Sequence, residues 1–219
     1  MKIGVFGGTF DPIHWGHLRS AEEVREAFSL DRVLFIPASI PPLKRKTPGA
    51  SAADRLALVR LAISGNKDFA VSRIELDRPG KSYSIDTLRH LNRQRPKGAA
   101  FYFILGLDAF LQIHRWKDFT AIFPLCHLIV TSRPGDGSSL TLKRMPVEVR
   151  KLFCYDPNRN AYRHSSGKVL FFYRLTDIAI SASEIRERLR QGKSVRYLLP
   201  RQVEEYIDRR HLYRGEKQR

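Results

Sequence analysis

Residues 2–18 read KIGVFGGTFDPIHWGHL, an apolar run followed by a glycine pair, an Asp-Pro turn and two histidines on either side of a glycine. The apolar run predicts a strand, and the amphipathic pattern that starts near His17 predicts a helix. Glycines let the backbone approach a bulky ligand closely, and a helix N-terminus offers free amides and the positive end of its dipole. The stretch therefore predicts a phosphate-binding strand–loop–helix unit, the first unit of an α/β fold.

Further runs that are typical of strands alternate with helical patterns along the chain. Together with Lys2–Phe6 they are Arg32–Ile36, Phe69–Ile74, Ala99–Leu105, His127–Thr131 and Lys168–Arg174. This alternation predicts a mostly parallel sheet. We therefore expect an α/β, doubly wound, Rossmann-like fold with helices on both faces, in which ligands bind beyond the carboxyl ends of the strands.

The second half of the chain is less regular. Between residues 133 and 167 the sequence is rich in Gly, Pro, Ser, Asn and Arg, which predicts a mobile excursion with one short helix near Pro146–Leu152. Helical patterns close the chain around Glu184–Arg190 and Arg201–Arg210. We expect a single domain, residues 1–219, with residues 1–175 as the α/β core and residues 176–219 as a small C-terminal helical subdomain.

The composition is that of a globular protein. Of the 219 residues 42% are hydrophobic, no charged and apolar leader precedes the first strand, and no apolar run reaches the roughly 20 residues of a membrane helix. We expect a cytoplasmic protein without a membrane partner. The net charge of +17 is scattered, with only Lys44-Arg45-Lys46 in a run, so it favours acidic small molecules over nucleic acid. The sequence leaves a homo-oligomer open.

The histidine pair carries more information than the glycines. The first loop lacks both G-x-G-x-x-G and G-x-x-x-x-G-K-[ST], which disfavours ordinary Rossmann dehydrogenases and P-loop phosphotransferases. One histidine at a helix start is often a cap or a packed ring, but His14 and His17 flank Gly16 at a strand–helix junction, which packing alone explains poorly. We therefore expect both imidazoles to face a polyphosphate.

A second candidate anion site lies in Ile180-Ser181-Ala182-Ser183-Glu184-Ile185-Arg186. Ser181 and Glu184 form a capping box, which by itself predicts only a well-capped helix. The box leaves Ser183 on the first turn and Arg186 one turn further in, where a hydroxyl, free amides and a guanidinium can converge on phosphate oxygens. Two such helix starts predict a triphosphate held between them.

These segments resemble the bacterial nicotinate-nucleotide adenylyltransferases, within the wider class of nucleotidyltransferases that carry H-x-G-H. The resemblance covers nearly the full length, in the expected order. The matching segments are Gly7–Leu18, Ser82–Leu88, Gly106–Asp108, Trp116–Phe119, Ile180–Arg186, Tyr197–Pro200 and Tyr206–Ile207. Ser183 and Ser84 stand where the family often has threonine, and both keep a hydroxyl at the position that matters.

The resemblance implies adenylyl transfer in NAD biosynthesis. The phosphate of nicotinate mononucleotide would attack the α-phosphorus of ATP, giving nicotinate adenine dinucleotide (deamido-NAD) and pyrophosphate without a covalent enzyme intermediate. His14 and His17 would stabilise charge at the α-phosphorus, and Ser183 and Arg186 would hold the β- and γ-phosphates. The resemblance also implies Mg²⁺ on the ATP phosphates, with no protein ligand assigned to the ion.

Two substrate sites are implied by the same resemblance. The residues implied at ATP are Gly7, Gly8, Thr9, Phe10, His14, His17, Gly106, Asp108, Ile180, Ser181, Ser183 and Arg186. The residues implied at nicotinate mononucleotide are Gly8, Thr9, Phe10, Lys44, Tyr83, Ser84, Trp116 and Arg133. Trp116 would stack on the nicotinate ring, and Tyr83 and Ser84 would present donors to its carboxylate, which suits an acid rather than an amide.

Other interpretations stay open at this level. Simple structural roles would be a helix start for Tyr83 and Ser84, core packing for Trp116, a helix cap for Asp108, and solvated charges for Lys44 and Arg133. The alternative functions are an adenylyltransferase that uses nicotinamide mononucleotide or phosphopantetheine, and a nucleotide- or RNA-binding module without turnover. The sequence shows neither the aromatic platform nor the G-x-x-G clamp of common RNA modules.

Overall fold

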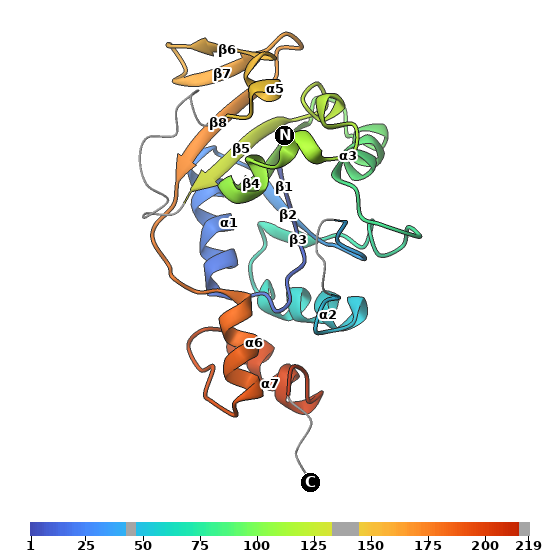
Figure 1. Cartoon of the computed structure of the whole chain (residues 1–219), viewed down its shortest axis with the longest axis vertical. Helices are drawn as coiled ribbons and strands as arrows, with labels where there is room; N and C mark the ends of the chain where they lie inside the picture. The colour runs from blue at the N-terminus through green and yellow to red at the C-terminus, as the bar shows by residue number, and fades with distance from the viewer. Residues whose placement is uncertain (43–46, 133–144, 215–219) are drawn as a thin grey trace.

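The computed structural model describes residues 1–42, 47–132 and 145–214 (Figure 1). Its centre is an eight-stranded sheet with the order β3-β2-β1-β4-β5-β8-β7-β6. The parallel strands are β1 (Lys2–Gly8), β2 (Arg32–Pro37), β3 (Phe69–Val71), β4 (Ala100–Gly106), β5 (His127–Ser132) and β8 (Val169–Arg174). The order steps from β1 to β2 and β3 on one side, and to β4, β5 and β8 on the other. The predicted doubly wound plan is therefore confirmed.

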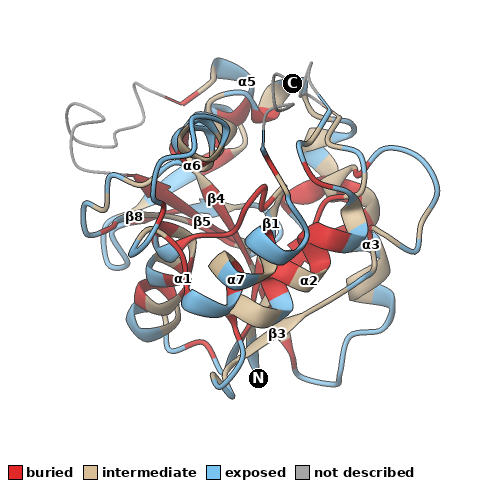
Figure 2. Ribbon diagram, turned by 90° about the horizontal axis from the view of Figure 1, so that it is seen from below, coloured by how far each residue is buried: buried red, intermediate tan, exposed pale blue. Residues whose placement is uncertain are grey.

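Helices cover both faces of the sheet because alternate residues of a strand point to opposite sides. In β2, Val33 and Phe35 belong to one buried cluster and Ile36 to another. Figure 2 shows the result, with red strands inside and helices whose outer surfaces are pale blue. The first cluster packs against α1 (Trp15–Ala27) and α2 (Ala52–Ala62), and the second against α3 (Ser84–Arg93), α4 (Leu107–Phe110), η1 (Ile113–Arg115) and η2 (Phe119–Ile122). None of the described helices is long and apolar enough to cross a membrane.

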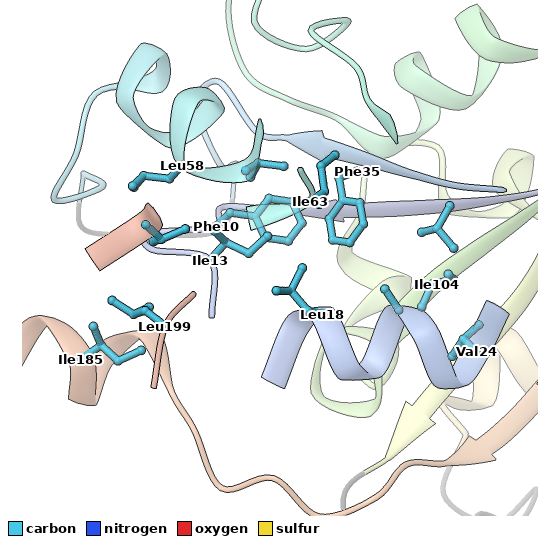
Figure 3. Close-up of a cluster of buried hydrophobic side chains, with 14 of the residues drawn as sticks. Phe10, Ile13, Leu18, Val24, Phe35, Leu58, Ile63, Ile104, Ile185 and Leu199 are labelled. Atoms are coloured by element: carbon cyan, nitrogen blue, oxygen red, sulfur yellow. The ribbon is translucent and has the colours of Figure 1, made fainter. Parts of the chain in front are cut away.

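The C-terminal helices α6 (Ala182–Arg190) and α7 (Arg201–Arg209) extend the first cluster beyond the sheet. Figure 3 shows Ile185 of α6 and Leu199 close to Phe10 and Ile13 of the loop between β1 and α1. Burial of one such side chain contributes about 1.5–3 kcal/mol. The C-terminal helices thus hold the loop that carries the first predicted anion site.

Residues 145–167 form more regular structure than the sequence predicts. The expected short helix is present as α5 (Val147–Arg150). It is followed by an antiparallel hairpin of β6 (Phe153–Asp156) and β7 (Ala161–His164), and β7 pairs with β8. The hairpin forms one edge of the sheet, at the opposite end of the molecule from α6 and α7 (Figure 1).

Candidate active site

A cavity of about 580 Å³ opens where β1 and β4 end. These strands adjoin at the point from which the sheet winds in two directions, and the loops that leave it diverge and form a crevice. The predicted residues in its lining are Gly7, Gly8, Phe10, His17, Gly106 and Asp108. The first loop and the end of β4 therefore face a single ligand space.

His14 and His17 lie together at the N-terminus of α1. His14 immediately precedes the helix with an extended backbone (φ −149°) and is 2% exposed. His17, in the first turn, lines the cavity. The two ring centroids are 3.8 Å apart, and the ring planes are 33° from parallel. Of the two rings, that of His17 lines the cavity and the buried ring of His14 packs against it. At this helix start the backbone N–H groups of Trp15 and His17 donate to the carbonyl oxygens of Leu198 at 3.2 Å and His14 at 2.9 Å.

Gly16 lets these histidines pack closely. A Cβ atom at this position would lie 3.0 Å from Nδ1 of His14 and 3.6 Å from the carbonyl oxygen of Ile180. An alanine would press on the His14 ring, whereas its distance to the Ile180 oxygen is an ordinary contact. The glycine thereby gives the His14 ring its space at the start of α1, close to the segment that leads into α6.

Phe10 lines the cavity, but most of its ring lies in the core. It is 2% exposed, and its ring meets the His17 ring nearly edge-on at a centroid distance of 5.2 Å. Its backbone is left-handed (φ 48°), which costs a residue with a side chain about 1–2 kcal/mol. Packing against Phe6 and Phe35 offsets this cost. Besides its predicted approach to substrates, Phe10 therefore fixes the position of His17.

Arg186 and Ser183 meet at the start of α6, as the sequence predicts. Nη2 of Arg186 donates to Oγ of Ser183 at 3.3 Å, and Nη1 donates to the carbonyl oxygen of Asp11 at 2.6 Å. Oγ of Ser181 accepts a hydrogen bond from the backbone N–H of Glu184 at 3.1 Å, so the predicted cap is confirmed. The guanidinium is thus tied both to its own helix and to the loop after β1.

The loop after β1 separates two cavities. Gly8 and Phe10 line the cavity of about 580 Å³, whereas Thr9 and Asp11 line a second cavity of about 600 Å³. The second cavity also contains Ser183 and Arg186, together with Arg190 and Arg214. A ligand that crosses this loop would meet His17 on one side and several cationic side chains on the other.

A third cavity, of about 220 Å³, contains the residues predicted to read the nicotinate group. Tyr83 and Ser84 reach it from the start of α3, and Trp116 reaches it from the end of η1. Within residues 1–42, 47–132 and 145–214, Nε1 of Trp116 is buried without a hydrogen-bond partner. Lys117 also lines this cavity, with Nζ 5.0 Å from the centre of the Tyr83 ring and 3.0 Å from Oδ2 of Asp86. Lys44 and Arg133 fall outside the described residues.

The sequence analysis missed Arg55 of α2. Arg55 is 1% exposed and donates to the carbonyl oxygens of Thr9 at 2.8 Å, Ala38 at 2.6 Å and Ser39 at 3.0 Å. Burial lowers the pKa of Arg55. The guanidinium thus joins the loops that follow β1 and β2. A signal existed, because Arg55 precedes Leu58 by three positions and so occupies the core-facing side of its helix.

The first cavity suits a metal ion that is coordinated mainly by a bound substrate and only slightly by the protein. In the described part of the chain, no group of three His, Cys, Asp or Glu side chains could hold a metal ion. Asp108 does bring one carboxylate to the cavity, at the start of α4. Mg²⁺ commonly binds through substrate phosphates, water and one or two carboxylates, so this arrangement is compatible with that ion.

Comparison with known proteins assigns the chain to a family. The cytidylyltransferase-like family matches residues 5–188. A protein of Syntrophotalea carbinolica named probable nicotinate-nucleotide adenylyltransferase is 48% identical over 217 residues, which cover 99% of both chains. A protein of the same name from Geobacter sulfurreducens is 47% identical, over 97% of this chain and 98% of its own. The chain belongs to the nicotinate-nucleotide adenylyltransferase family.

This nucleotidyltransferase also shares its fold with distant proteins of known structure. The nicotinic acid mononucleotide adenylyltransferase of Plasmodium falciparum, complexed with NaAD, matches with a TM-score of 0.71 at 18% identity, over 97% of each chain. A crystal structure from Vibrio parahaemolyticus, of a protein named putative nicotinate-nucleotide adenylyltransferase, matches with a TM-score of 0.61 at 17% identity, over 98% of this chain and 96% of its own. The close relatives confirm the family resemblance, and these structures confirm the Rossmann-like fold.

Proposed function

We propose that the chain transfers the adenylyl group of ATP to nicotinate mononucleotide, a step in NAD biosynthesis that yields nicotinate adenine dinucleotide and pyrophosphate. The observation that carries this proposal is the loop after β1, which lines two polar cavities with alternate residues. His17 lies on one cavity and Arg186 on the other, so a triphosphate across the loop would contact both. The names of the close relatives support this reaction.

In the proposed reaction an oxygen of the mononucleotide phosphate forms a bond to the α-phosphorus of ATP. The bond from that phosphorus to the bridging oxygen breaks, and pyrophosphate leaves with the electron pair. Phosphoryl chemistry of this kind needs alignment and charge stabilisation more than a protein nucleophile. We assign both to His14 and His17 at the α-phosphate, because their rings pack together at a helix start and His17 lines the cavity.

Ser183 and Arg186 hold the β- and γ-phosphates in this proposal, with Thr9 on the same cavity. Arg186 is already hydrogen-bonded to the Asp11 carbonyl at 2.6 Å, so its side chain loses little further freedom when phosphate binds. Ile180 and Ser181 place this helix start beside Gly16. The leaving pyrophosphate then departs toward a fixed positive charge.

The remaining parts of the substrates occupy the other predicted positions. The adenosine portion lies at the end of β4, where Gly106 and Asp108 line the cavity of about 580 Å³. The nicotinate ring stacks on Trp116 in the cavity of about 220 Å³, and Tyr83 and Ser84 donate to its carboxylate. Roles for Lys44 and Arg133 at the mononucleotide stay predictions.

Mg²⁺ would enter with the ATP phosphates, and we assign it no protein ligand. When bound, the ion neutralises charge on the phosphates. We further propose that residues 1–219 act as one domain, because the C-terminal helices share a buried cluster with the loop after β1. A cytoplasmic location stays a prediction.

The test is pyrophosphate release from ATP and Mg²⁺ with each of three acceptors in parallel, namely nicotinate mononucleotide, nicotinamide mononucleotide and phosphopantetheine. Mass spectrometry identifies the product. We expect a strong preference for the acid mononucleotide. Equal use of both mononucleotides would keep adenylyl transfer and reject the acid specificity. Use of phosphopantetheine alone would reassign the acceptor, and nucleotide or RNA binding without pyrophosphate release would favour a module without turnover.

A further inference from the structure

The carboxylate of Asp11 is a buried meeting point of three chain segments. Asp11 is 5% exposed, and its carboxylate accepts hydrogen bonds from the backbone N–H groups of Gly49 at 2.8 Å and Ala50 at 3.1 Å. A third bond comes from the hydroxyl of Tyr213, at 2.8 Å, across 202 residues of sequence. Tyr213 follows α7 and is itself only 9% exposed. The end of the C-terminal helical part is thus hydrogen-bonded to the loop after β1.

The same aspartate also holds Arg186. The Asp11 carbonyl oxygen accepts from Nη1 of Arg186 at 2.6 Å, and a carboxylate oxygen lies 3.8 Å from the same nitrogen. A shift of Asp11 would therefore move the guanidinium. The carboxylate of Asp11 accepts from Tyr213 and its backbone carbonyl accepts from Arg186, so Asp11 links the two side chains.

Packing reinforces this linkage. A Cβ atom on Gly49 would lie 3.0 Å from the ring of Tyr213 and 3.3 Å from Cδ of Arg186. The two side chains thus contact the same small residue from adjacent directions. Because Gly49 contributes its amide to Asp11 as well, the contacts around Asp11 and Arg186 form one packed unit.

The Tyr213 hydroxyl stays protonated and can therefore act as a permanent hydrogen-bond donor. Burial, followed by the negative charge of Asp11, raises the pKa of Tyr213 far above its ordinary value. The phenol therefore keeps its proton wherever the protein is folded, and it always donates toward the carboxylate.

We propose that Tyr213 is a positioning residue for adenylyl transfer, which acts through Asp11 to hold the Arg186 guanidinium where charge develops on the leaving pyrophosphate. Tyr213 lines the cavity of about 600 Å³ beside Arg186, but its hydroxyl donates to Asp11. This inference rests on the proposed role of Arg186 in binding the phosphates.

The chain offers a matched control for the loss of the Tyr213 hydroxyl. Tyr206 of α7 donates to Oδ1 of Asp54 at 3.0 Å, and Asp54 is also buried. Tyr206→Phe thus removes a tyrosine hydroxyl from the same C-terminal region as Tyr213. The hydrogen bond that it breaks goes to Asp54 of α2 and not to Asp11. We expect Tyr213→Phe to lower kcat by about tenfold with KM for nicotinate mononucleotide within about twofold, and Tyr206→Phe to leave both unchanged.

A double-mutant cycle separates positioning from general destabilisation. If Tyr213 acts through Arg186, Tyr213→Phe should have less than about a twofold further effect on kcat in an Arg186→Ala background. If the losses in kcat of the two single variants multiply in the double variant, the two residues act independently and the inference is overturned. If Tyr213→Phe does not fold, as judged by thermal unfolding, Gly49→Ala provides the second variant, because its Cβ presses on both side chains without removing a polar group.

The same cycle is measured in the affinity for a non-hydrolysable ATP analogue, by calorimetry. Coupling between Tyr213 and Arg186 in this affinity supports the inference even if the wild-type protein makes no dinucleotide from either mononucleotide, a result that would reject the proposed function alone. Absence of coupling in an active wild-type enzyme rejects the inference and leaves the proposed function intact.

Discussion

The imidazole rings of His14 and His17 lie face to face at the start of α1, with centroids 3.8 Å apart. Gly16 makes this contact sterically accessible, and Phe10 packs on the edge of the His17 ring. The mutual contact and the packing of Phe10 therefore hold the His17 ring in place before any ligand arrives. Preorganised donors of this kind stabilise developing charge without reorganising during the reaction.

We expect His17→Ala to lower kcat for adenylyl transfer by at least about tenfold, which corresponds to about 1.4 kcal/mol in the barrier. The reason is the loss of a donor that lines the ATP cavity. Steady-state kinetics and a thermal unfolding curve measure the effect. His211→Asn, at an exposed position beyond α7, serves as the control. Near-normal turnover in folded His17→Ala would remove His17 from the mechanism.

Ser84→Ala should weaken discrimination between nicotinate and nicotinamide mononucleotides. Ser84 lines the cavity of about 220 Å³, and loss of its hydroxyl removes a donor to the carboxylate while leaving the ring site intact. We expect the ratio of kcat/KM for the two substrates to fall by about tenfold, a typical loss for one charge-assisted hydrogen bond. KM for ATP is the internal control. An unchanged ratio would assign acid recognition to other groups.

Arg55→Met should destabilise the fold strongly. It would leave the carbonyl oxygens of Thr9, Ala38 and Ser39 without their donor, among which the Ala38 bond is buried and the other two are half-buried. A buried group without its partner costs about 1–3 kcal/mol. We expect the free energy of unfolding in urea to fall by on the order of 3 kcal/mol. Arg60→Met, at an exposed position of the same helix, should change it little. Equal effects of the two substitutions would contradict this account.

Stability should fall in mild acid because of His127. Burial, together with the positive charge of Lys168, lowers the pKa of His127 from about 6.5 to about 4. As pH falls below about 6.5, His127 takes up a proton in the unfolded chain before it does so in the folded protein, so the free energy of unfolding decreases. The contribution of the neutral His127 side chain to stability is fully lost below about pH 4. We expect a contribution on the order of 2 kcal/mol after allowance for partial solvent exposure.

His127→Asn tests this pH dependence. The asparagine side-chain oxygen can replace Nδ1, which accepts from the backbone N–H of Val169 at 3.2 Å. Urea unfolding between pH 7 and pH 4 should show a shallower fall in stability for His127→Asn than for the wild type. His90→Asn, a substitution of another partly exposed histidine, should keep the wild-type slope. A wild-type slope in His127→Asn would refute the prediction.

Sequence patterns predict local features of this fold well. The capping box at Ser181 involves residues three positions apart, and the structure contains the bond from the backbone N–H of Glu184 to Oγ of Ser181. Strand ends are less well defined by hydrophobicity. β1 continues to Gly8 because Gly7 and Gly8 lie in register with Ile36 and Pro37 of β2, and pairing extends a strand that its own side chains do not mark.

Features that depend on contacts between residues far apart in the sequence cannot be predicted from local patterns. The β6–β7 hairpin lacks a clear alternation because Cys154 and Tyr155, which are adjacent, are both exposed at the edge of the sheet. Arg55 looks like a misplaced charge until the two loops that it joins are known. The family resemblance implies residues for two substrate sites, but it does not predict the linkage through Asp11, because the groups of this linkage are brought together only by tertiary packing.

The bond between Asp11 and Tyr213 also orders events during synthesis. A ribosome that has just added Asp11 must add 202 more residues before Tyr213 exists, which takes about 10–40 s at about 5–20 residues per second. Strand β1 therefore emerges well before Tyr213, whose hydrogen bond to Asp11 holds the loop that follows this strand. A nascent chain stalled after α7 would already contain both histidines and Arg186, yet it would lack this last contact.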